Sequence, residues 1–317
     1  MTDDATRVAC DGPFVRHPGN PILTSADLPY PANTVFNSAA TAHADETLLL
    51  LRVEDRSGFS HLTVARSADG VGGWRIDEQP TLVRDPENHP EETWGIEDPR
   101  ITYLEREDKY AVTYTGYSPR GPLVSLALTA DFHGFQRIGA VLPPDNKDAA
   151  LFPVRFNRRW AMIHRPVSTM TGGGDIWLSF SPDLRHWGDH QLLIQARSGP
   201  WWDSGKIGLS PPPLRTDEGW LVMYHGVRHT CAGALYRLGL ALLDLEDPRR
   251  VIRRSREWIF GPSRRYELEG DVGYVTFPCG WIADGDRVRM YYGAADTSMA
   301  LATASLTELL DWLRERS

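Results

Sequence analysis

The feature that most constrains the fold is an apolar or aromatic strand pattern that recurs five times along the chain. Its copies lie at residues 47–52, 110–116, 160–165, 220–226 and 288–293. Their first residues are roughly 50 to 70 positions apart, which is enough chain for a four-stranded antiparallel sheet in each repeat. We therefore expect one sheet per repeat, with neighbouring repeats packed against each other.

Each repeat contains two further segments that look like strands. A second strand follows the apolar one at residues 60–67, 123–129, 176–181, 235–242 and 299–304. Another precedes it at residues 34–42, 96–104, 149–156, 207–214 and 272–282. Three of the second strands run into a turn in which an Asp follows a Ser or Thr by two residues, at Asp69, Asp131 and Asp183. An Asp in such a turn typically accepts hydrogen bonds from its own backbone, so these are interpreted as structural turns.

Five antiparallel units without long helical stretches between them favour a β-propeller over a β-sandwich. Only the end of the chain looks helical, where Ser305 and Glu308 have the spacing of a capping box. The apolar face of this helix is expected to comprise Leu306, Leu309, Leu310 and Leu313. The predicted fold is all-β, a five-bladed β-propeller with a short C-terminal helix, forming a single domain over residues 1–317.

Composition and charge exclude several classes of protein. The 317 residues include 34 Lys and Arg against 42 Asp and Glu, a net charge of -8, which argues against a nucleic-acid or anionic-membrane surface. The first residues are acidic, and the chain has no apolar run long enough to span a membrane, so we expect a cytoplasmic protein. Cys10, Cys231 and Cys279 have no Cys-x-x-Cys spacing and are expected to be packing thiols in a reducing compartment.

Polar residues occupy matched places in the repeats. In a propeller the inner strand of each blade lines the central channel, so such residues are expected to meet at the channel entrance. Those ahead of the apolar strands are Asn37, Glu97, Asp98, Lys147, Asp148, Asp203, Lys206 and Asp271. Those at the far ends of the apolar strands are Arg52, His164, Arg165, His225 and Asp296. We interpret the two sets as one shared site.

The most informative stretch is Gly-Ile-Glu-Asp-Pro-Arg at residues 95–100. Pro99 disfavours a helical conformation at Asp98, so the segment is expected to be extended, with Asp98 and Arg100 on one face and Glu97 on the other. Asp98 could serve as a general acid or base, while Arg100 could bind substrate or pair with an acid. A close Arg would lower the pKa of Asp98, which is unfavourable for an acid that must hold a proton near neutrality.

The cationic members of the two sets indicate an anionic ligand. We expect these residues to bind phosphate or a carboxylate, because a protein that is acidic as a whole places four cationic or potentially cationic side chains together, namely Arg52, Arg165, Lys206 and His225. The sequence has no Gly-x-x-x-x-Gly-Lys loop, Gly-x-Gly-x-x-Gly turn or Gly-x-Ser-x-Gly elbow, which argues against nucleotide binding and serine hydrolase chemistry. No tight spacing of ligands indicates a metal.

Aromatic residues in the expected loops favour a carbohydrate ligand. They include Trp94, Trp201 and Trp202. Aromatic faces in clefts stack on the C–H faces of sugars, although packing between blades is the alternative for each of them.

Several long motifs, in order, resemble those of glycoside hydrolase family 130, five-bladed propellers that include β-mannoside phosphorylases and some β-mannosidases. The resemblance extends from about residue 20 to residue 304. Its motifs lie at residues 95–100, 147–153, 164–166, 202–208, 224–226 and 291–296. It implies a β-mannoside substrate, inorganic phosphate as co-substrate and no metal or organic cofactor. Family members often form homo-oligomers.

The resemblance also implies residue roles. Asp98 matches the general acid of the family, which protonates the glycosidic oxygen through the 3-hydroxyl of the mannosyl unit. The residues that match or lie near its phosphate ligands are Arg52, Arg165, Lys206, His225 and Tyr236. Those that resemble its mannosyl-binding residues are Asn37, Arg100, Asp148 and Asp296.

Two reactions are compatible with this resemblance. An inverting hydrolase needs a second carboxylate to activate water, whereas a phosphorylase needs cations that hold phosphate. His225 and Tyr236 stand where acidic residues are expected in the hydrolases, so we predict conversion of a β-mannoside and phosphate to α-D-mannose 1-phosphate and a shortened acceptor. The alternatives are an inverting β-mannosidase, with Glu97, Glu267 or Asp271 as its base, and a non-catalytic sugar-binding propeller. β-1,4 and β-1,2 linkages, and mannose, glucose or N-acetylglucosamine as acceptor, stay open.

Overall fold

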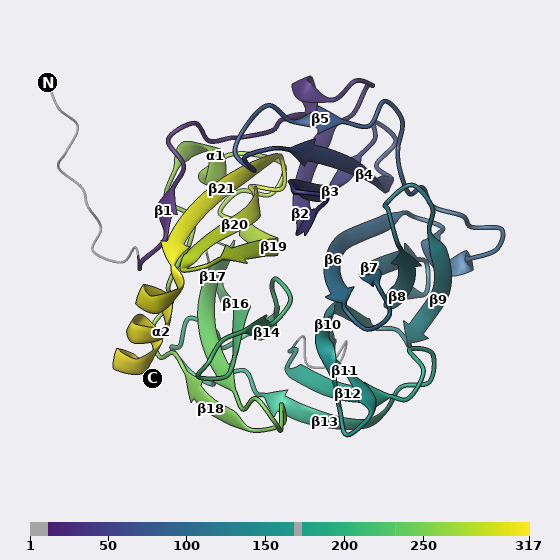
Figure 1. Cartoon of the computed structure of the whole chain (residues 1–317). Helices are drawn as coiled ribbons and strands as arrows, with labels where there is room; N and C mark the ends of the chain where they lie inside the picture. Colours follow the sequence, from purple (N-terminus) through teal and green to yellow (C-terminus); the bar gives the residue numbers. More distant parts are fainter. Residues whose placement is uncertain (1–11, 168–172, 232) are drawn as a thin grey trace, which may run out of the picture.

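Five antiparallel sheets are arranged in a ring around a central axis (Figure 1). The computed structural model describes residues 12–167, 173–231 and 233–317. Blade 1 comprises β2 (Thr34–His43), β3 (Glu46–Glu54), β4 (Ser60–Ser67) and β5 (Arg75–Ile76). Blade 2 comprises β6 (Ile96–Leu104), β7 (Lys109–Ser118), β8 (Gly121–Thr129) and β9 (Gln136–Leu142). Blade 3 comprises β10 (Asn146–Phe156), β11 (Arg159–Pro166), β12 (Ile176–Ser181) and β13 (Gly188–Ile194).

The last two blades complete the ring. Blade 4 comprises β14 (Lys206–Leu209), β16 (Trp220–Thr230), β17 (Gly233–Leu243) and β18 (Val251–Arg254), with β15 (Leu214–Arg215) also paired to β16. Blade 5 comprises β19 (Thr276–Asp284), β20 (Arg287–Ala294), β21 (Ser298–Ser305) and β1 (Val15–Arg16). Short helical segments are η1 (Ser25–Asp27), η2 (Pro90–Glu92) and α1 (Arg265–Leu268), and α2 (Leu306–Glu315) ends the chain. The predicted five-bladed propeller with a C-terminal helix is therefore confirmed.

Both ends of the chain contribute to blade 5, which closes the ring. The outermost strand β1 pairs antiparallel with β21, with Val15 opposite Thr303 and Arg16 opposite Ala302. Because β1 is only two residues long, its sequence carries no alternating pattern, and the sequence analysis did not predict it.

The inner strands of blades 4 and 5 differ from the predicted ones. The segment 207–214 is two strands, β14 and β15, because the prolines at 211–213 between them cannot donate the hydrogen bonds of a sheet. The inner strand of blade 5 begins at Thr276, four residues later than expected. Cys279 is buried as predicted, but Cys231 is exposed, so it is not a packing thiol. Cys10 lies outside the described residues.

The hydrophobic core lies between adjacent blades, which explains the unbroken apolar run in β3. Leu48 and Leu50 pack in a cluster with residues of blade 2, whereas Leu49 and Leu51 pack in a cluster with residues of blade 5. All four side chains are fully buried. A strand that is covered on both faces is apolar at every position, as β3 is.

The turns and the C-terminal helix form as the sequence predicts. One carboxylate oxygen each of Asp69, Asp131 and Asp183 accepts two hydrogen bonds from backbone N–H groups two and three residues later. Ser305 caps α2 by accepting a hydrogen bond from the Glu308 N–H. Leu309 and Leu313 are buried against blades 4 and 5, and Leu306 and Leu310 pack at the edge of the same cluster.

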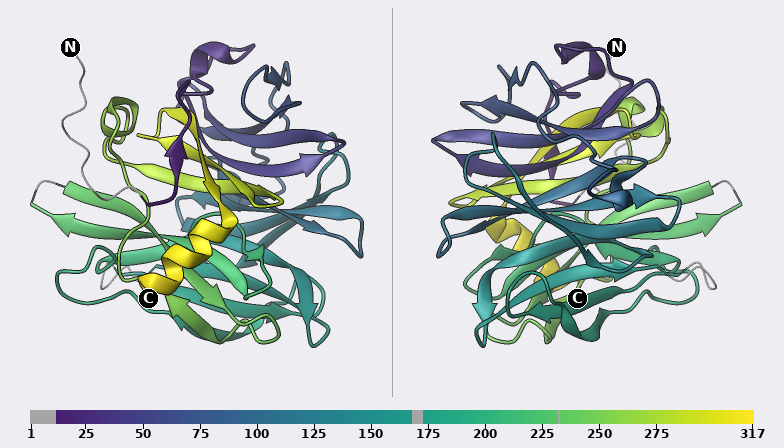
Figure 2. Two further views of the ribbon diagram at one scale, coloured as in Figure 1. Left: turned by 60° about the vertical axis from the view of Figure 1, so that its left-hand side comes forward. Right: turned by 90° about the vertical axis from the view of Figure 1, so that its right-hand side faces the viewer.

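One hairpin extends beyond the ring. The strands β16 and β17 are each 11 residues long, and their joined end projects from the body of the propeller (Figure 2). Among the described residues, no helix combines the length and the apolar character needed to cross a membrane.

We expect substitutions on either face of β3 to destabilise the fold to a similar degree. Leu49→Ala and Leu50→Ala should each lower the free energy of unfolding by about 2–5 kcal/mol, because each leaves a cavity in a different blade interface. Leu192→Ala is the control, since Leu192 is largely exposed, and it should change stability by less than about 0.5 kcal/mol. Urea unfolding followed by tryptophan fluorescence measures all three. A Leu49 or Leu50 variant as stable as the Leu192 variant would contradict this packing.

Candidate active site

The central polar residues stand on β-bulges that recur in three blades. Asn37, Asp98 and Asp148 lie near the starts of the inner strands β2, β6 and β10, where in each case two residues face a single partner residue. Their φ angles are 48°, 48° and 54°, in the left-handed region. Asn and Asp tolerate this region better than other side chains, and a bulge turns a side chain away from its regular direction. The bulges thus explain how three blades direct a polar group to one place.

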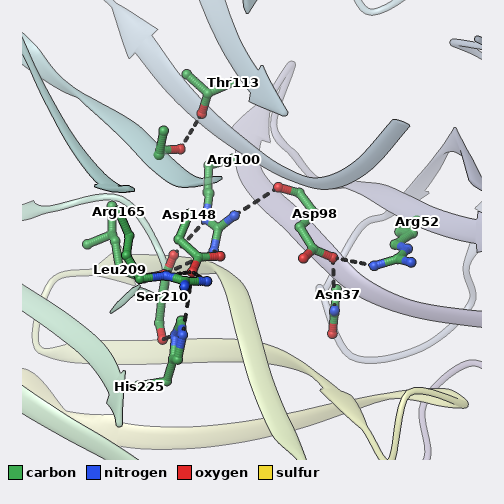
Figure 3. Close-up of polar contacts among 11 residues, drawn as sticks. Asn37, Arg52, Asp98, Arg100, Thr113, Asp148, Arg165, Leu209, Ser210 and His225 are labelled. Carbon is green, nitrogen blue, oxygen red and sulfur yellow. Dashed lines mark hydrogen bonds and ion pairs between the residues drawn. The ribbon is translucent and has the colours of Figure 1, made fainter. Parts of the chain in front are cut away.

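Asp98 is buried and bound on one oxygen. Its Oδ1 accepts hydrogen bonds from Asn37 Nδ2 at 2.9 Å and from Arg52 Nη1 at 2.8 Å (Figure 3). Burial raises the pKa of Asp98, but the positive charges of Arg52, Lys147 and Arg100 outweigh that effect and hold the pKa below its usual value. Among the described residues, no side chain or backbone group bonds to Oδ2. That oxygen is therefore available to a ligand.

Glu97 lies beside Asp98 rather than on the opposite face. Arg52 donates from Nη2 to Glu97 Oε1 at 3.0 Å while its Nη1 binds Asp98, and its Nε donates to Ser60 Oγ at 3.0 Å. The predicted alternation of Glu97 and Asp98 in an extended segment is therefore wrong, because the bulge and the left-handed backbone at Asp98 interrupt it. Burial raises the pKa of Glu97, although Arg52 opposes this shift.

Asp148 forms the second centre of the pocket. Its Oδ2 accepts hydrogen bonds from Arg165 Nε at 2.8 Å, and Arg165 Nη2 lies 2.7 Å from the same oxygen. His225 Nε2 lies 3.5 Å away from it. Burial raises the pKa of Asp148, but the charge of Arg165 and other nearby cations lowers it well below its ordinary value. Asp148 is thus a buried carboxylate that stays ionised.

Arg100 connects the Asp98 and Asp148 groups. Its side chain is 1% exposed and lies between the Asp98 and Asp148 groups (Figure 3). Nη1 donates to the backbone carbonyl of Asp98 at 3.0 Å, and Nη2 lies 3.4 Å from Asp148 Oδ1. Nε and Nη2 also donate to the carbonyls of Ser210 and Leu209 at 2.9 and 3.0 Å. Arg100 therefore contacts the backbone of Asp98 and not its carboxylate, and it joins blades 2, 3 and 4.

His225, Tyr236 and Lys206 lie on the blade 4 side. The rings of His225 and Tyr236 are stacked with centroids 6.2 Å apart, and Phe277 of blade 5 packs against His225 at 4.7 Å. Burial lowers the pKa of His225 to about 3, so this imidazole is neutral despite its contact with Asp148. Burial and the charges of Arg165 and Lys147 lower the pKa of Lys206, which places its ammonium near those cations.

Asp296 approaches from blade 5. It lies in the turn between β20 and β21 and has a φ of 49°. Burial and the neighbouring charge of Asp98 raise the pKa of Asp296 to about 6, while Arg52 and Lys147 oppose this shift. The ten residues named for the site are therefore linked to one another by contacts or by electrostatic interactions.

Other members of the matched sets lie elsewhere. Asp203 is buried in ion pairs with Arg197 and Arg254 at 2.8 and 2.7 Å, so it anchors blade 4 and does not reach the channel. His164 points into blade 3, where it contacts Asn146 and Ser179. Asp271 is exposed and accepts a hydrogen bond from Asn33. The shared-site interpretation was wrong for these three, because strand periodicity gives a position along a blade but not the direction of the side chain.

The three tryptophans that the sequence suggested as sugar-binding residues also differ in their surroundings. Trp202 is buried, stacks on Tyr224 and donates to the carbonyl of Arg256, so it packs blade 4. Trp94 and Trp201 remain exposed.

Two glycines that the sequence analysis did not single out make room for the pocket. A Cβ at Gly208 would lie 2.5 Å from Asp148 Oδ2 and 2.6 Å from His225 Cε1. A Cβ at Gly293 would collide with Asn37 Oδ1. The sequence did contain a signal, because Gly116, Gly226 and Gly293 recur at the end of the apolar strand in three repeats.

No metal centre is apparent in the part of the chain that the structure describes, where no three His, Cys, Asp or Glu side chains are grouped to hold an ion.

Comparisons with known proteins agree with this fold and pocket. Residues 16–315 match a family model described as beta-1,4-mannooligosaccharide phosphorylase. The chain is 34% identical over 319 residues to the beta-1,4-mannooligosaccharide phosphorylase of Ruminococcus albus, covering 97% of this chain and 93% of that one. It is 41% identical over 262 residues to the beta-1,2-mannobiose phosphorylase of Listeria innocua, covering 81% and 71%.

A solved structure of a mannoside phosphorylase also superposes on this chain. The beta-1,2-mannobiose phosphorylase from Listeria innocua, in complex with beta-1,2-mannobiose, superposes with a TM-score of 0.87 and 33% identity over 96% of this chain and 99% of that one. The fold and the relatives together define a five-bladed β-propeller enzyme that acts on mannosides. The chain belongs to glycoside hydrolase family 130, as its motifs predicted.

We expect Arg100 to be required for the stability of the pocket. Arg100→Met should lower the free energy of unfolding by about 3–5 kcal/mol, because it leaves buried carbonyls and part of the Asp148 charge without a partner. Arg155→Met removes a partly exposed ion pair with Glu107 and should cost about 1 kcal/mol or less. Chemical denaturation of both variants measures the difference. Equal losses would show that Arg100 does not link the blades.

Proposed function

We propose that this chain is an inverting phosphorylase of β-mannosides. It transfers the mannosyl unit from a β-mannoside to inorganic phosphate and produces α-D-mannose 1-phosphate and a shortened acceptor. A phosphate oxygen attacks the anomeric carbon, the bond from that carbon to the acceptor oxygen breaks, and the acceptor oxygen takes a proton. The observation that carries the proposal is the joint placement of a carboxylate with a free oxygen, Asp98, and a group of cations around Asp148.

The two ends of the pocket support different roles. Asp98 serves as the general acid and acts through the 3-hydroxyl of the mannosyl unit, as the family resemblance implies. Phosphate is held by Arg52, Arg165, Lys206, His225 and Tyr236. Asn37, Asp148 and Asp296 hold the mannosyl hydroxyls or the side chains that contact them. Arg100 serves as a positioning residue rather than as a direct ligand, because its guanidinium donates to the carbonyls of Asp98, Leu209 and Ser210 and lies beside Asp148.

Neutral His225 suits a phosphate site. A neutral imidazole can donate one hydrogen bond to a phosphate oxygen, and the guanidinium of Arg165 can supply charge-assisted hydrogen bonds. Because Asp148 already compensates Arg165, the site does not concentrate uncompensated charge before phosphate arrives.

The contacts of the candidate bases favour phosphorolysis over hydrolysis. Glu267 is fully buried and its carboxylate accepts hydrogen bonds from Arg16, Tyr292 and the backbone N–H groups of Ser263 and Arg264. Asp271 is at the exposed surface, and Glu97 is paired with Arg52. None of the three is an unpaired carboxylate facing a water across the sugar from Asp98, which an inverting hydrolase requires.

Relatives with β-1,2 and with β-1,4 linkages both match this chain. The beta-1,2-mannobiose phosphorylase is 41% identical over 81% of this chain, and the beta-1,4-mannooligosaccharide phosphorylase is 34% identical over 97% of it. A panel of acceptor sugars, with the linkage of each product determined by NMR, identifies the linkage that this chain forms.

We expect synthesis from α-mannose 1-phosphate to separate the possible functions. The wild-type protein should release inorganic phosphate when given an acceptor sugar. Asp98→Asn should lower kcat by about 100-fold or more while mannoside binding persists, because the acid is lost and its shape is kept. Lys206→Ala and His225→Ala should raise the KM for phosphate in the degradative direction.

The contrary outcomes are distinct. Phosphate-independent release of mannose from β-mannosides would indicate the hydrolase. Mannoside binding without turnover in the wild-type protein would indicate a sugar-binding module. Unchanged phosphate dependence in both the Lys206 and His225 variants would contradict the assigned phosphate site.

We expect mannoside binding to weaken as the pH falls through about 6. Asp296 has a pKa raised to about 6, so it is protonated below that pH and loses an acceptor for sugar hydroxyls. Calorimetric titration with a β-mannobiose in the absence of phosphate avoids the titration of phosphate itself. Asp296→Asn should bind more weakly at pH 7 and show a flatter profile. Glu97→Gln is the control, and a profile that flattens in this variant instead would assign the titration to Glu97.

A further inference from the structure

Two aromatic side chains at one end of blade 2 remain exposed. Trp94 is 40% exposed and Tyr117 is 38% exposed. Their ring centroids are 5.3 Å apart with an interplanar angle of 66°, an edge-to-face pair. Neither residue has a role in the pocket described above or in the packing between blades. Single exposed apolar side chains need no explanation, whereas two aromatic rings in contact at the end of the blade that carries Asp98 form a candidate binding surface.

The pair is fixed to the segment that carries Asp98. The Trp94 N–H donates to the Tyr117 carbonyl at 2.8 Å, and the Tyr117 N–H donates to the Gly95 carbonyl at 3.1 Å. Gly95 forms a bridge with Ser60, whose hydroxyl accepts the hydrogen bond from Arg52 Nε. Trp94 precedes β6 and Tyr117 lies near the end of β7, so both lie at the same end of blade 2 as Asp98.

The surroundings of the pair suit a sugar better than a protein. Aromatic faces bind the C–H faces of sugar rings, and adjacent carboxylates accept hydrogen bonds from sugar hydroxyls. The partly exposed Glu97 supplies such a carboxylate three residues after Trp94. In the chain the pair is bordered by the polar residues Thr93 and Arg120, and Pro122 lies opposite Tyr117 in the sheet, so the exposed apolar patch comprises few side chains. A stable protein interface buries about 800 Å² on each partner, which is far more than this patch offers.

We propose that Trp94 and Tyr117 form an acceptor-side sugar subsite, which holds the part of a β-mannoside chain that leaves when phosphate attacks. The proposal rests on the proposed function, because the mannosyl unit is assigned to the inner groups, Asp98, Asp148 and Asp296. The aromatic pair lies before the inner strand that carries Asp98, so it is placed for the sugar farther out along the chain. The subsite would select for acceptors longer than one sugar.

The test is the synthetic reaction with α-mannose 1-phosphate and acceptors of increasing length, from mannose to β-mannobiose and β-mannotriose. For Trp94→Ala and Tyr117→Ala, the KM for the longer acceptors should rise about five- to tenfold, while kcat and the KM for α-mannose 1-phosphate stay unchanged. Trp94→Phe should retain most of the wild-type affinity because it keeps an aromatic face. Tyr103→Ala is the matched control, since Tyr103 is also 38% exposed but lies toward the other end of β6.

Three results would overturn the proposal. The first is an unchanged acceptor KM in both alanine variants. The second is a change of oligomeric state in Trp94→Ala, measured by sedimentation, without a change in acceptor KM, which would assign the pair to an interface between copies. The third is an equal Kd of wild type and Trp94→Ala for β-mannotriose, measured by calorimetry. This binding measurement is the test if the wild-type protein does not turn over, an outcome that would contradict the proposed function but not the subsite.

Discussion

The pocket depends on the buried Asp148 carboxylate and the cations that neutralise it. Arg100 comes from blade 2, Asp148 and Arg165 from blade 3, and His225 from blade 4. Removing these charges from water costs several kcal/mol for each ion, which their mutual attraction returns only when the geometry is good. The network therefore adds little net stability to a propeller whose apolar blade interfaces already hold it together. The network instead fixes three blades relative to one another at the proposed active site.

The β-bulges determine which polar side chains the blades present at the proposed active site. An unbroken strand would direct alternate side chains into the two blade interfaces, which are apolar. Two bulge residues opposite a single partner release Asn37, Asp98 and Asp148 from that alternation. Glycines at 208 and 293 supply the space that the released side chains occupy. The same blade can thus keep apolar residues between blades and present a carboxylate to the channel.

The repeated strand pattern in the sequence made most of the fold predictable. The features that could not be predicted lie where this pattern is absent or interrupted. The strong strands could be recognised because both of their faces are buried, as Leu48 to Leu51 are. The closing strand β1 could not, because two residues carry no period. The matched positions of Asn37, Asp98 and Asp148 were evident in the sequence, but the side-chain directions of His164 and Asp203 were not, since a polar residue on a strand has the same pattern whether it faces the channel or a buried partner. The relation of Glu97 to Asp98 was missed for the same reason, because a bulge is a local feature of the backbone.

The electrostatics of Asp98 set a condition on the mechanism. Arg52 and other cations keep this carboxyl ionised, whereas a general acid needs a proton. The overall proton balance of the proposed phosphorolysis is closed, because HPO₄²⁻ brings a proton that the dianionic product α-mannose 1-phosphate no longer carries, and the acceptor hydroxyl gains one. Asp98 must nevertheless hold a proton when the glycosidic bond breaks, so substrate binding has to favour its protonated form against the charge of Arg52. Its Oδ1 is occupied by Asn37 and Arg52, which leaves Oδ2 to hold that proton. An inverting hydrolase would face the same condition, because its acid must also be protonated when water attacks, so the choice between the two reactions depends on what activates or holds the nucleophile and not on Asp98.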